Sequence, residues 1–121
     1  GRDTGGRRAV GDGPRGGEGE VAEMSQPVIL LDAARAEFDE AYDYLQGQRL
    51  GLGEEFAEKV RAVFTRIATT PKLHQVVLKG VRRAVVSKFS YCVYYREEAD
   101  CIRVLSVFHT SRDPAIWQGR A

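Results

Sequence analysis

Three short strand-like segments near the C-terminal end constrain the fold of this chain more than any other feature. Residues 81–89, 91–96 and 102–108 are rich in β-branched and aromatic side chains. Brief connections at 89–90 and 97–100 separate them. Strands joined so closely must pair in antiparallel order, because a parallel pair needs a long crossover. The sequence therefore predicts a three-stranded meander at the centre of the molecule.

A strand and two amphipathic helices are predicted before this meander. The apolar run Val28–Leu31 fits a buried strand that opens the domain. Apolar side chains at helical spacing predict a helix over 32–45, with Asp32 as its N-cap, and a second helix from Leu52 to the Thr70-Pro71 pair. Residues 72–80 are expected to link helix and sheet. The predicted fold class is α+β: an N-terminal strand and an antiparallel helix hairpin, packed on a small, mainly antiparallel β-sheet.

The first 26 residues differ from the rest in composition. They are rich in glycine and scattered charges and show no periodicity, which predicts a disordered extension at 1–26 followed by one domain at 27–121. Met24 is a candidate for the native start. The acidic and glycine residues at 17–20 would be encoded by purine-rich codons, at the distance that a bacterial ribosome-binding site keeps from its start codon.

The charges are distributed unevenly. Residues 27–71 contain five Lys/Arg and eight Asp/Glu, whereas residues 72–121 contain nine Lys/Arg and four Asp/Glu. The sheet half is therefore basic and the helical half acidic, which favours an acidic partner and permits a polyanion. With no apolar run of membrane-spanning length and no signal-peptide pattern at the start, a cytoplasmic protein is expected.

The two cysteines and two histidines predict neither a disulfide nor a metal site. A hairpin turn centred on Glu98 and Ala99 places Cys92 opposite Leu105 and Cys101 opposite Arg96, so the thiols are out of register. Reduced thiols are the expectation. The histidines are isolated from acidic residues at ligand spacing, and no phosphate-binding loop is evident, so neither a metal nor a cofactor is expected.

One face of the meander is predicted to bind a partner. Strict alternation places Leu105, Val107 and Tyr94 on the same face as several cations, and a half-apolar, half-cationic face suits a partner protein. The opposing interpretation is that these side chains touch the flanks of the chain's own core. Trp117 is expected to fold back on the domain. The predicted partner-binding residues are Arg83, Tyr94, Arg96, Arg103, Leu105, Val107, His109, Arg112 and Trp117.

The same basic side chains could instead form a metal-free ribonuclease site. Such a site needs a base for the ribose hydroxyl, cations for the phosphorane and an acid for the leaving oxygen. Lys88, His109 and Arg112 are the candidates for these roles. Surface lysine and arginine are more often solvated than catalytic, so this set is an alternative to the binding interpretation.

The order of elements, together with SKFSYCVYYR at 87–96 and VLSVFHTSRDPAIW at 104–117, resembles the RelE/ParE family of toxins from bacterial type II toxin–antitoxin systems. The resemblance covers about residues 28–120. It implies a small cytosolic toxin that a cognate antitoxin neutralises by wrapping around it. RelE-like members cleave messenger RNA on the ribosome, whereas ParE-like members inhibit DNA gyrase by binding it.

The ParE-like branch fits better when the RelE pattern is carried over residue by residue. When the RelE pattern is aligned on Tyr91, the position of its phosphate-binding arginine falls on Ser87. Anchored on Trp117, the second arginine falls on Ser111, and the indole has no hydroxyl to act as an acid. We therefore expect a plasmid-stabilisation type of toxin that is not an enzyme and binds gyrase. A ribosome-dependent endoribonuclease and an inactive, antitoxin-bound regulator remain the alternatives.

Overall fold

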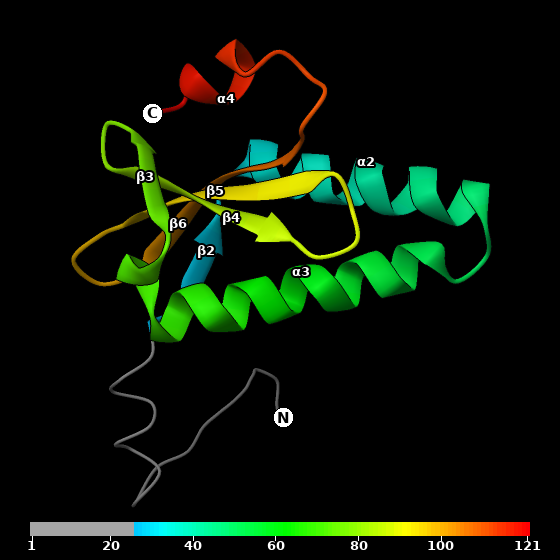
Figure 1. Cartoon of the computed structure of the whole chain (residues 1–121), viewed down its shortest axis with the longest axis horizontal. Coiled ribbons are helices and arrows are strands. Elements are labelled where there is room, and N and C mark those ends of the chain that lie inside the picture. The colour runs from blue at the N-terminus through cyan, green and yellow to red at the C-terminus, as the bar shows by residue number, and fades with distance from the viewer. Residues whose placement is uncertain (1–25) are drawn as a thin grey trace, which may run out of the picture.

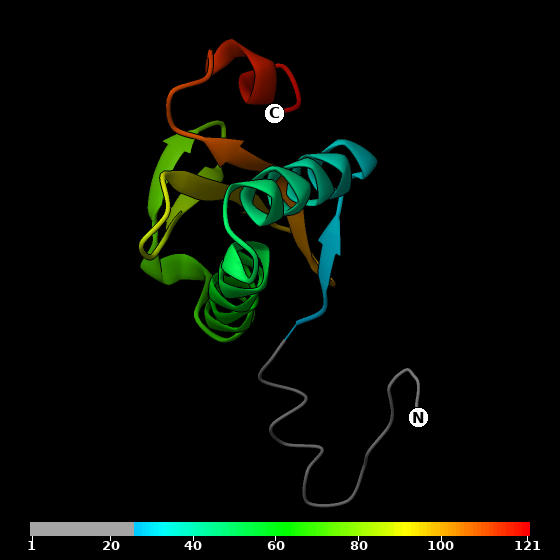
Figure 2. The same cartoon turned by 90° about the vertical axis from the view of Figure 1, so that its right-hand side faces the viewer.

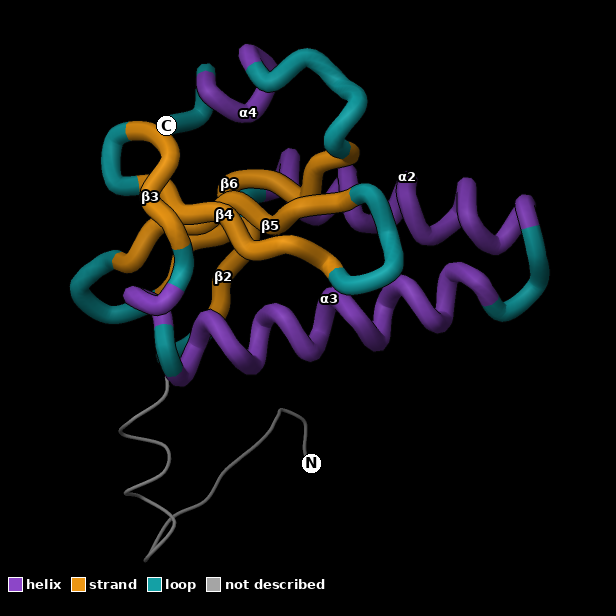
Figure 3. Tube along the Cα trace, in the orientation of Figure 1, coloured by secondary structure: helices purple, strands orange, loops and turns teal. Residues whose placement is uncertain are grey.

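The computed structural model describes residues 26–121. The prediction of disorder at 1–26 and the candidate start at Met24 therefore lie outside the described residues, apart from Gln26. The described elements follow one another as strand, helix hairpin, 3-10 turn, four strands and a short helix (Figures 1 and 3). They are β2 (Val28–Leu30), α2 (Asp32–Gln48), α3 (Leu52–Thr69), η2 (Pro71–Leu73), β3 (Gln75–Leu78), β4 (Val81–Val86), β5 (Tyr91–Glu97), β6 (Ile102–His109) and α4 (Ala115–Gln118).

The strands form one five-stranded sheet in the order β2-β6-β5-β4-β3. β2 pairs with β6 in parallel, which is possible because the connection between them is long: it contains the helix hairpin and the strands β3, β4 and β5. The other pairs are antiparallel. The predicted α+β architecture and the central meander are confirmed.

The strand β3 was not predicted, since residues 72–80 were interpreted as a link. It pairs with β4 through a two-residue turn in which Lys79 and Gly80 have φ values of 49° and 79°. Two left-handed residues match the twist of a tight hairpin. Lysine at the first of these positions is unusual, so the sequence carries no Asn-Gly or Asp-Gly signal for this turn.

The two helices pack closely because Gly53 lets their backbones approach. A β-carbon at Gly53 would lie 2.5 Å from Cγ of Gln46 and 2.8 Å from the carbonyl oxygen of Tyr42. The Gln46 side chain also accepts hydrogen bonds from the Gly51 and Gly53 amides, at 3.0 and 2.8 Å. It thereby satisfies two of the amides that the start of α3 leaves without helical partners.

The predicted helix boundaries change at two points. Asp32 is the first residue of α2 rather than its N-cap, and Leu31 occupies the cap position without a side-chain hydrogen bond. The Asp32 carboxylate still lies in the first turn, where its negative charge interacts favourably with the positive end of the helix dipole. α2 also continues to Gln48, three residues beyond the predicted end at residue 45.

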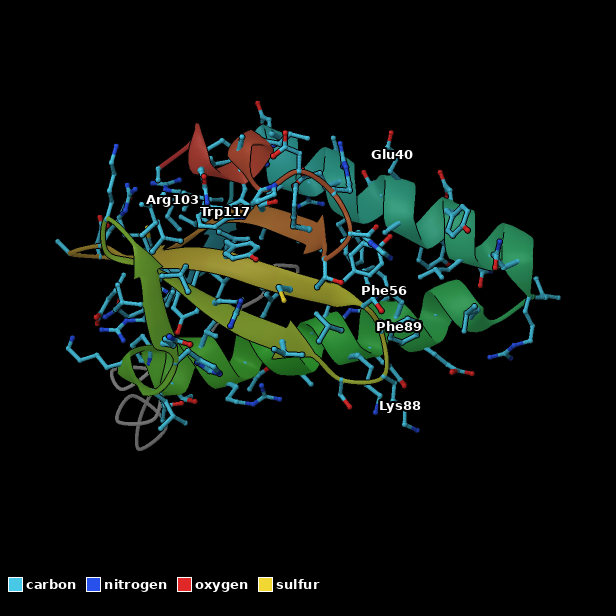
Figure 4. The ribbon with its side chains drawn as sticks, turned by 45° about the horizontal axis from the view of Figure 1, so that its top comes forward. Glu40, Phe56, Lys88, Phe89, Arg103 and Trp117 are labelled. Atoms are coloured by element: carbon cyan, nitrogen blue, oxygen red, sulfur yellow. The ribbon has the colours of Figure 1, made fainter. Side chains whose placement is uncertain are left out.

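One core lies between the helices and the sheet. Phe56 of α3 is fully buried there, and its ring contacts those of Phe38, Phe89 and Tyr91 at centroid distances of 5.7, 5.4 and 4.9 Å (Figure 4). Aromatic pairs at these distances add to the stabilisation from buried area. The other fully buried members come from both helices and from β4, β5 and β6.

A β-bulge in β6 changes which side chains face the helices. The pairing of β5 with β6 shifts between Tyr94 and Tyr95, which leaves Leu105 as the extra residue. Val107 consequently packs in the core beneath the helices, and Phe108 packs on the opposite face. The prediction that Val107 shares a face with Leu105 is therefore wrong.

The hairpin register between β5 and β6 also differs from the prediction. Cys92 pairs with Phe108, and Arg96 pairs with Arg103. The turn is centred one residue later than expected, so each residue of β5 pairs with a residue of β6 two positions further along. At Cys92 the β-bulge adds one more position, so Cys92 pairs with Phe108 rather than Leu105. Both cysteines are free.

A second core covers the opposite face of the sheet. Trp117 of α4 is 3% exposed and stacks on Tyr94 at a centroid distance of 4.0 Å and an interplanar angle of 13°. Figure 2 shows α4 on the far side of the sheet from α3. The expectation that Trp117 folds back is confirmed. The buried members of this second core are Val81, Cys92, Tyr94, Leu105, Phe108 and Trp117.

Two charged side chains hold the C-terminal segment against the part of β6 that β2 leaves unpaired. The Arg120 guanidinium donates to both carboxylate oxygens of Glu37 at 3.0 Å and to the carbonyl oxygen of Leu105 at 3.0 Å. The Glu37 carboxylate also accepts from the Val107 amide at 3.2 Å and from the Ser106 hydroxyl at 2.7 Å. The pair therefore closes a free strand edge and fixes the tail.

Substituting Gly53→Ala should lower the free energy of unfolding by about 1–3 kcal/mol, because the added methyl overpacks the contact between α2 and α3. Gly47→Ala is the matched control, since a β-carbon added there would have nothing within 4 Å. It should raise stability by about 0.5–1 kcal/mol through helix propensity. Urea unfolding followed by circular dichroism measures both. Equal effects of the two alanines would contradict the close-packing explanation.

Substituting Glu37→Gln should loosen the C-terminal segment, because Arg120 loses charge-assisted hydrogen bonds worth about 1–3 kcal/mol. Trp117 is the sole tryptophan of the chain, so a red shift of its emission reports the change directly. Glu40→Gln, three residues further along α2 and exposed, is the control and should leave the emission unchanged. An unshifted spectrum in the Glu37 variant would show that the ion pair does not hold the tail.

Candidate functional site

Three arginines share the face of the sheet opposite α2 and α3. Arg83 pairs with Tyr94 across β4 and β5, and Arg96 pairs with Arg103 across β5 and β6. Because alternate side chains of a strand share a face, all three arginines lie on the Tyr94 side. Side chains paired across strands are close neighbours. We call Arg83, Arg96 and Arg103 the arginine face.

The centre of this face is occupied by the chain itself, which corrects the prediction of a vacant apolar surface. Tyr94 and Leu105 are 8% and 1% exposed because α4 covers them, and Trp117 of α4 is itself only 3% exposed. Apolar surface remains only at the border in the described residues, where Val85 and Ile116 are 62% and 40% exposed. The face is therefore a covered apolar centre with a cationic border.

The arginines at the border differ in exposure and in whether a carboxylate lies close enough to neutralise their charge. The Arg103 guanidinium lies 3.4 Å from a carboxylate oxygen of Glu98, and both side chains are about one-third exposed. Arg83 is exposed and lies beside the Tyr94 hydroxyl. Burial raises the pKa of Tyr94, and the Arg83 charge opposes that shift. Arg83 is thus the most accessible cation of the arginine face.

A separate cleft of about 510 Å³ lies at the end of the sheet, between α2 and the turn that follows β6. We call it the end cleft. It combines acidic and aromatic side chains of α2 with basic and polar ones from the sheet and the turn. Its lining residues are Glu37, Glu40, Ala41, Tyr44, Tyr91, Val107, His109, Ser111 and Arg112.

His109 has a defined orientation in the end cleft. Its Nδ1 accepts a hydrogen bond from the Ser111 amide at 3.1 Å, and the Ser111 hydroxyl lies 2.8 Å from the same nitrogen. A backbone amide can only donate, so a neutral ring carries its proton on Nε2. The ring also packs edge-on against Tyr91 at a centroid distance of 4.9 Å. Burial raises the pKa of the Tyr91 hydroxyl.

The three residues proposed for a ribonuclease are only partly brought together. Arg112 lines the end cleft with His109, and its guanidinium carbon lies 5.5 Å from the centre of the Phe108 ring. Lys88 belongs to the turn between β4 and β5 and is not among the residues that line the cleft. Figure 4 shows Lys88 well separated from Glu40, which does line it. Lys88 is therefore not positioned to act with His109.

Sequence reasoning missed the contribution of α2 to the end cleft. Glu37, Glu40, Ala41 and Tyr44 recur at the spacing of one helix face. This stripe borders the apolar one, and no functional role was predicted for it. The signal that could have found it is Tyr44, a large aromatic that is 62% exposed, on that stripe.

The described part of the chain offers no metal site and no membrane-spanning helix. Residues 26–121 contain no cluster of three or more His, Cys, Asp or Glu side chains suited to a metal ion. Over the same range, no helix combines the length and apolar character that a membrane crossing requires.

Comparison with solved structures identifies a similar fold. The chain "Chromosomal ParDE TA system from P. aeruginosa" superimposes with a TM-score of 0.64 and 12% sequence identity. The match covers 73% of this chain and 99% of the other. At this identity the likeness shows the shared fold. No curated protein sequence matches the chain.

Comparison with protein-family models identifies the family. Residues 28–114, from the start of β2 to the turn before α4, match the model described as the ParE toxin of the type II toxin–antitoxin system parDE. The matched range includes the helix hairpin, the whole sheet and all three members of the arginine face. This chain therefore belongs to the ParE toxin family of type II toxin–antitoxin systems.

Proposed function

We propose that this chain is a cytoplasmic toxin that inhibits DNA gyrase by binding it, and that a cognate ParD-type antitoxin neutralises it. The match of residues 28–114 to the ParE toxin family carries this proposal. In the RelE/ParE family that the sequence resembles, ParE-like members act by binding gyrase, and RelE-like members act by cleaving messenger RNA.

The geometry of the end cleft supports binding over RNA cleavage. General acid–base cleavage of RNA needs an acid, a base and a cation within reach of one phosphate. His109 and Arg112 meet at the cleft, but Lys88 lies apart from it. Arg112 is also engaged over the Phe108 ring, where a cation–π contact stabilises it.

We assign the arginine face to the antitoxin. Its border carries three cations beside the exposed Val85, and this combination suits a partner with acidic and apolar side chains. The apolar centre under Trp117 remains closed, so the antitoxin is expected to contact the border of the face rather than its middle.

The purified chain should inhibit ATP-dependent DNA supercoiling by gyrase, and induced expression without antitoxin should cause filamentation and a DNA-damage response. His109→Ala should retain this inhibition, because the proposed mechanism uses no acid–base group. Supercoiling assays and growth curves of both proteins are the measurements. Rapid translation arrest with cleaved messages, lost on His109→Ala, would replace the proposal with ribosome-dependent RNA cleavage. Absence of any growth effect would favour an inactive regulator.

Substituting Arg83→Glu together with Arg96→Glu should weaken antitoxin binding by roughly tenfold or more, because like charges would face an acidic partner. The matched control is Arg35→Glu with Arg61→Glu, which reverses two exposed cations on α2 and α3. Growth during co-expression with the antitoxin encoded beside the toxin gene, and titration of the purified pair, measure the effect. Equal neutralisation of both double variants would remove the arginine face from the antitoxin site.

A further inference from the structure

The end cleft has an acidic wall, which α2 supplies. This helix carries five acidic residues and one arginine over Asp32–Gln48. Two of the acidic residues, Glu37 and Glu40, line the cleft. Because opposite charges attract across a cleft, the acidic wall favours a cationic occupant.

One of these two carboxylates is available to an occupant. The Glu37 carboxylate is sheltered, and both of its oxygens already accept hydrogen bonds from Arg120. Glu40 is exposed, and within residues 26–121 it belongs to no ion pair. A carboxylate in this position can form a charge-assisted hydrogen bond with a cation from outside the chain.

Aromatic rings line the cleft beside Glu40. Tyr44 lies one helical turn further along α2 and is 62% exposed. On the sheet side, the rings of Tyr91 and His109 meet edge-on, at an interplanar angle of 87°. The face of a tyrosine ring attracts cations, and a planar guanidinium stacks on it. The exposed Tyr44 ring and the Glu40 carboxylate therefore form a pair suited to a guanidinium.

Arg112 is the one arginine or lysine among the residues that line the end cleft. Its guanidinium carbon lies 5.5 Å from the centre of the Phe108 ring. Phe108 belongs to the second core, on the face of the sheet opposite α2 and α3. The contact therefore holds the Arg112 charge towards that face, which reduces its repulsion of a cation beside Glu40.

We propose that the end cleft binds an arginine side chain that a partner protein presents on its surface. The guanidinium stacks on the Tyr44 ring and donates to the Glu40 carboxylate, since its planar fork suits both contacts. A volume of about 510 Å³ accommodates one such side chain together with the backbone that carries it.

The identity of the partner rests on the proposed function. The antitoxin assigned to the arginine face is acidic, and like charges disfavour it at the acidic wall of the end cleft. We therefore assign the arginine to the target, gyrase, because an enzyme that binds DNA carries basic surface side chains. The toxin then meets its antitoxin and its target through surfaces of opposite charge.

A blocked Gly-Arg-Gly peptide is the probe, and a blocked Gly-citrulline-Gly peptide is its counterpart with the same shape and no charge. On the full chain, the arginine peptide should shift the NMR signals of the Tyr44 and Tyr91 rings, and its binding should weaken as salt rises. The citrulline peptide should bind roughly tenfold more weakly. Equal binding of the two peptides, or shifts confined to residues outside the cleft, would overturn the proposal.

Glu40→Gln and Asp39→Asn form a matched pair of variants. Each removes one negative charge from an exposed residue of α2, but only Glu40 lines the end cleft. Glu40→Gln should weaken binding of the arginine peptide by roughly tenfold, and Asp39→Asn should change it little. Equal losses would mean that the peptide senses net charge rather than the cleft, which contradicts the proposed site.

Arg112→Gln tests the sign of the charge that the cleft recognises. The variant should bind the arginine peptide at least as tightly as the wild type, because it removes a like charge. Weaker binding of that peptide, together with binding of inorganic phosphate that the substitution abolishes, would identify an anion site and overturn the proposal.

Gyrase inhibition links the cleft to the target. Glu40→Gln should raise roughly tenfold the toxin concentration that inhibits supercoiling, and it should leave binding of the antitoxin unchanged. Undiminished inhibition by this variant would remove the target from the end cleft. If the wild type does not inhibit gyrase but still prefers arginine to citrulline, the proposed function fails and the arginine site stands, so the two proposals can fail separately.

Discussion

The structure depends on β6 being buried on both of its faces. A central strand flanked by β2 and β5 has its backbone groups paired on both sides over residues 102–104, and its side chains enter two cores. The bulge at Leu105 is what allows this arrangement. Without the extra residue, strict alternation would place Val107 beside Leu105, and a one-residue shift reverses the face of every later side chain. The bulge thus turns Val107 towards the helices and Phe108 towards Trp117.

The helices and the meander could be predicted from the sequence because each has a strong, local signal. The stripes of α2 and α3 follow the helical period, whereas the parallel pairing of β2 with β6 was not predicted, because a three-residue apolar run does not show which strand it pairs with. β3 escaped prediction because four residues and a Lys-Gly turn give neither periodicity nor a recognised turn pair. The bulge escaped because LSVF at 105–108 is compatible with burial on either face.

The candidate site was predicted less well than the fold, and one error accounts for most of the difference. The sequence identified the cations of the sheet face and predicted that Trp117 folds back, but it did not indicate that Trp117 covers the centre of that same face. Trp117 lies near the end of the chain, beyond an exposed turn, and its contact with Tyr94 is long-range in sequence. Of the predicted partner-binding residues, the three arginines stay at the accessible border, while His109 belongs to the end cleft.

The covered centre changes where a partner can gain binding energy. Burying apolar surface that the chain's own tail already covers would require displacing Trp117 from Tyr94, so the net gain in binding free energy is small. The tail itself is held by Glu37 and Arg120, whose side chains are only 10% and 21% exposed, and a pair this sheltered is weakly screened by salt. The accessible border offers cations instead. In the antitoxin complex proposed above, charge complementarity at this border would therefore contribute more to recognition than burial of the apolar centre.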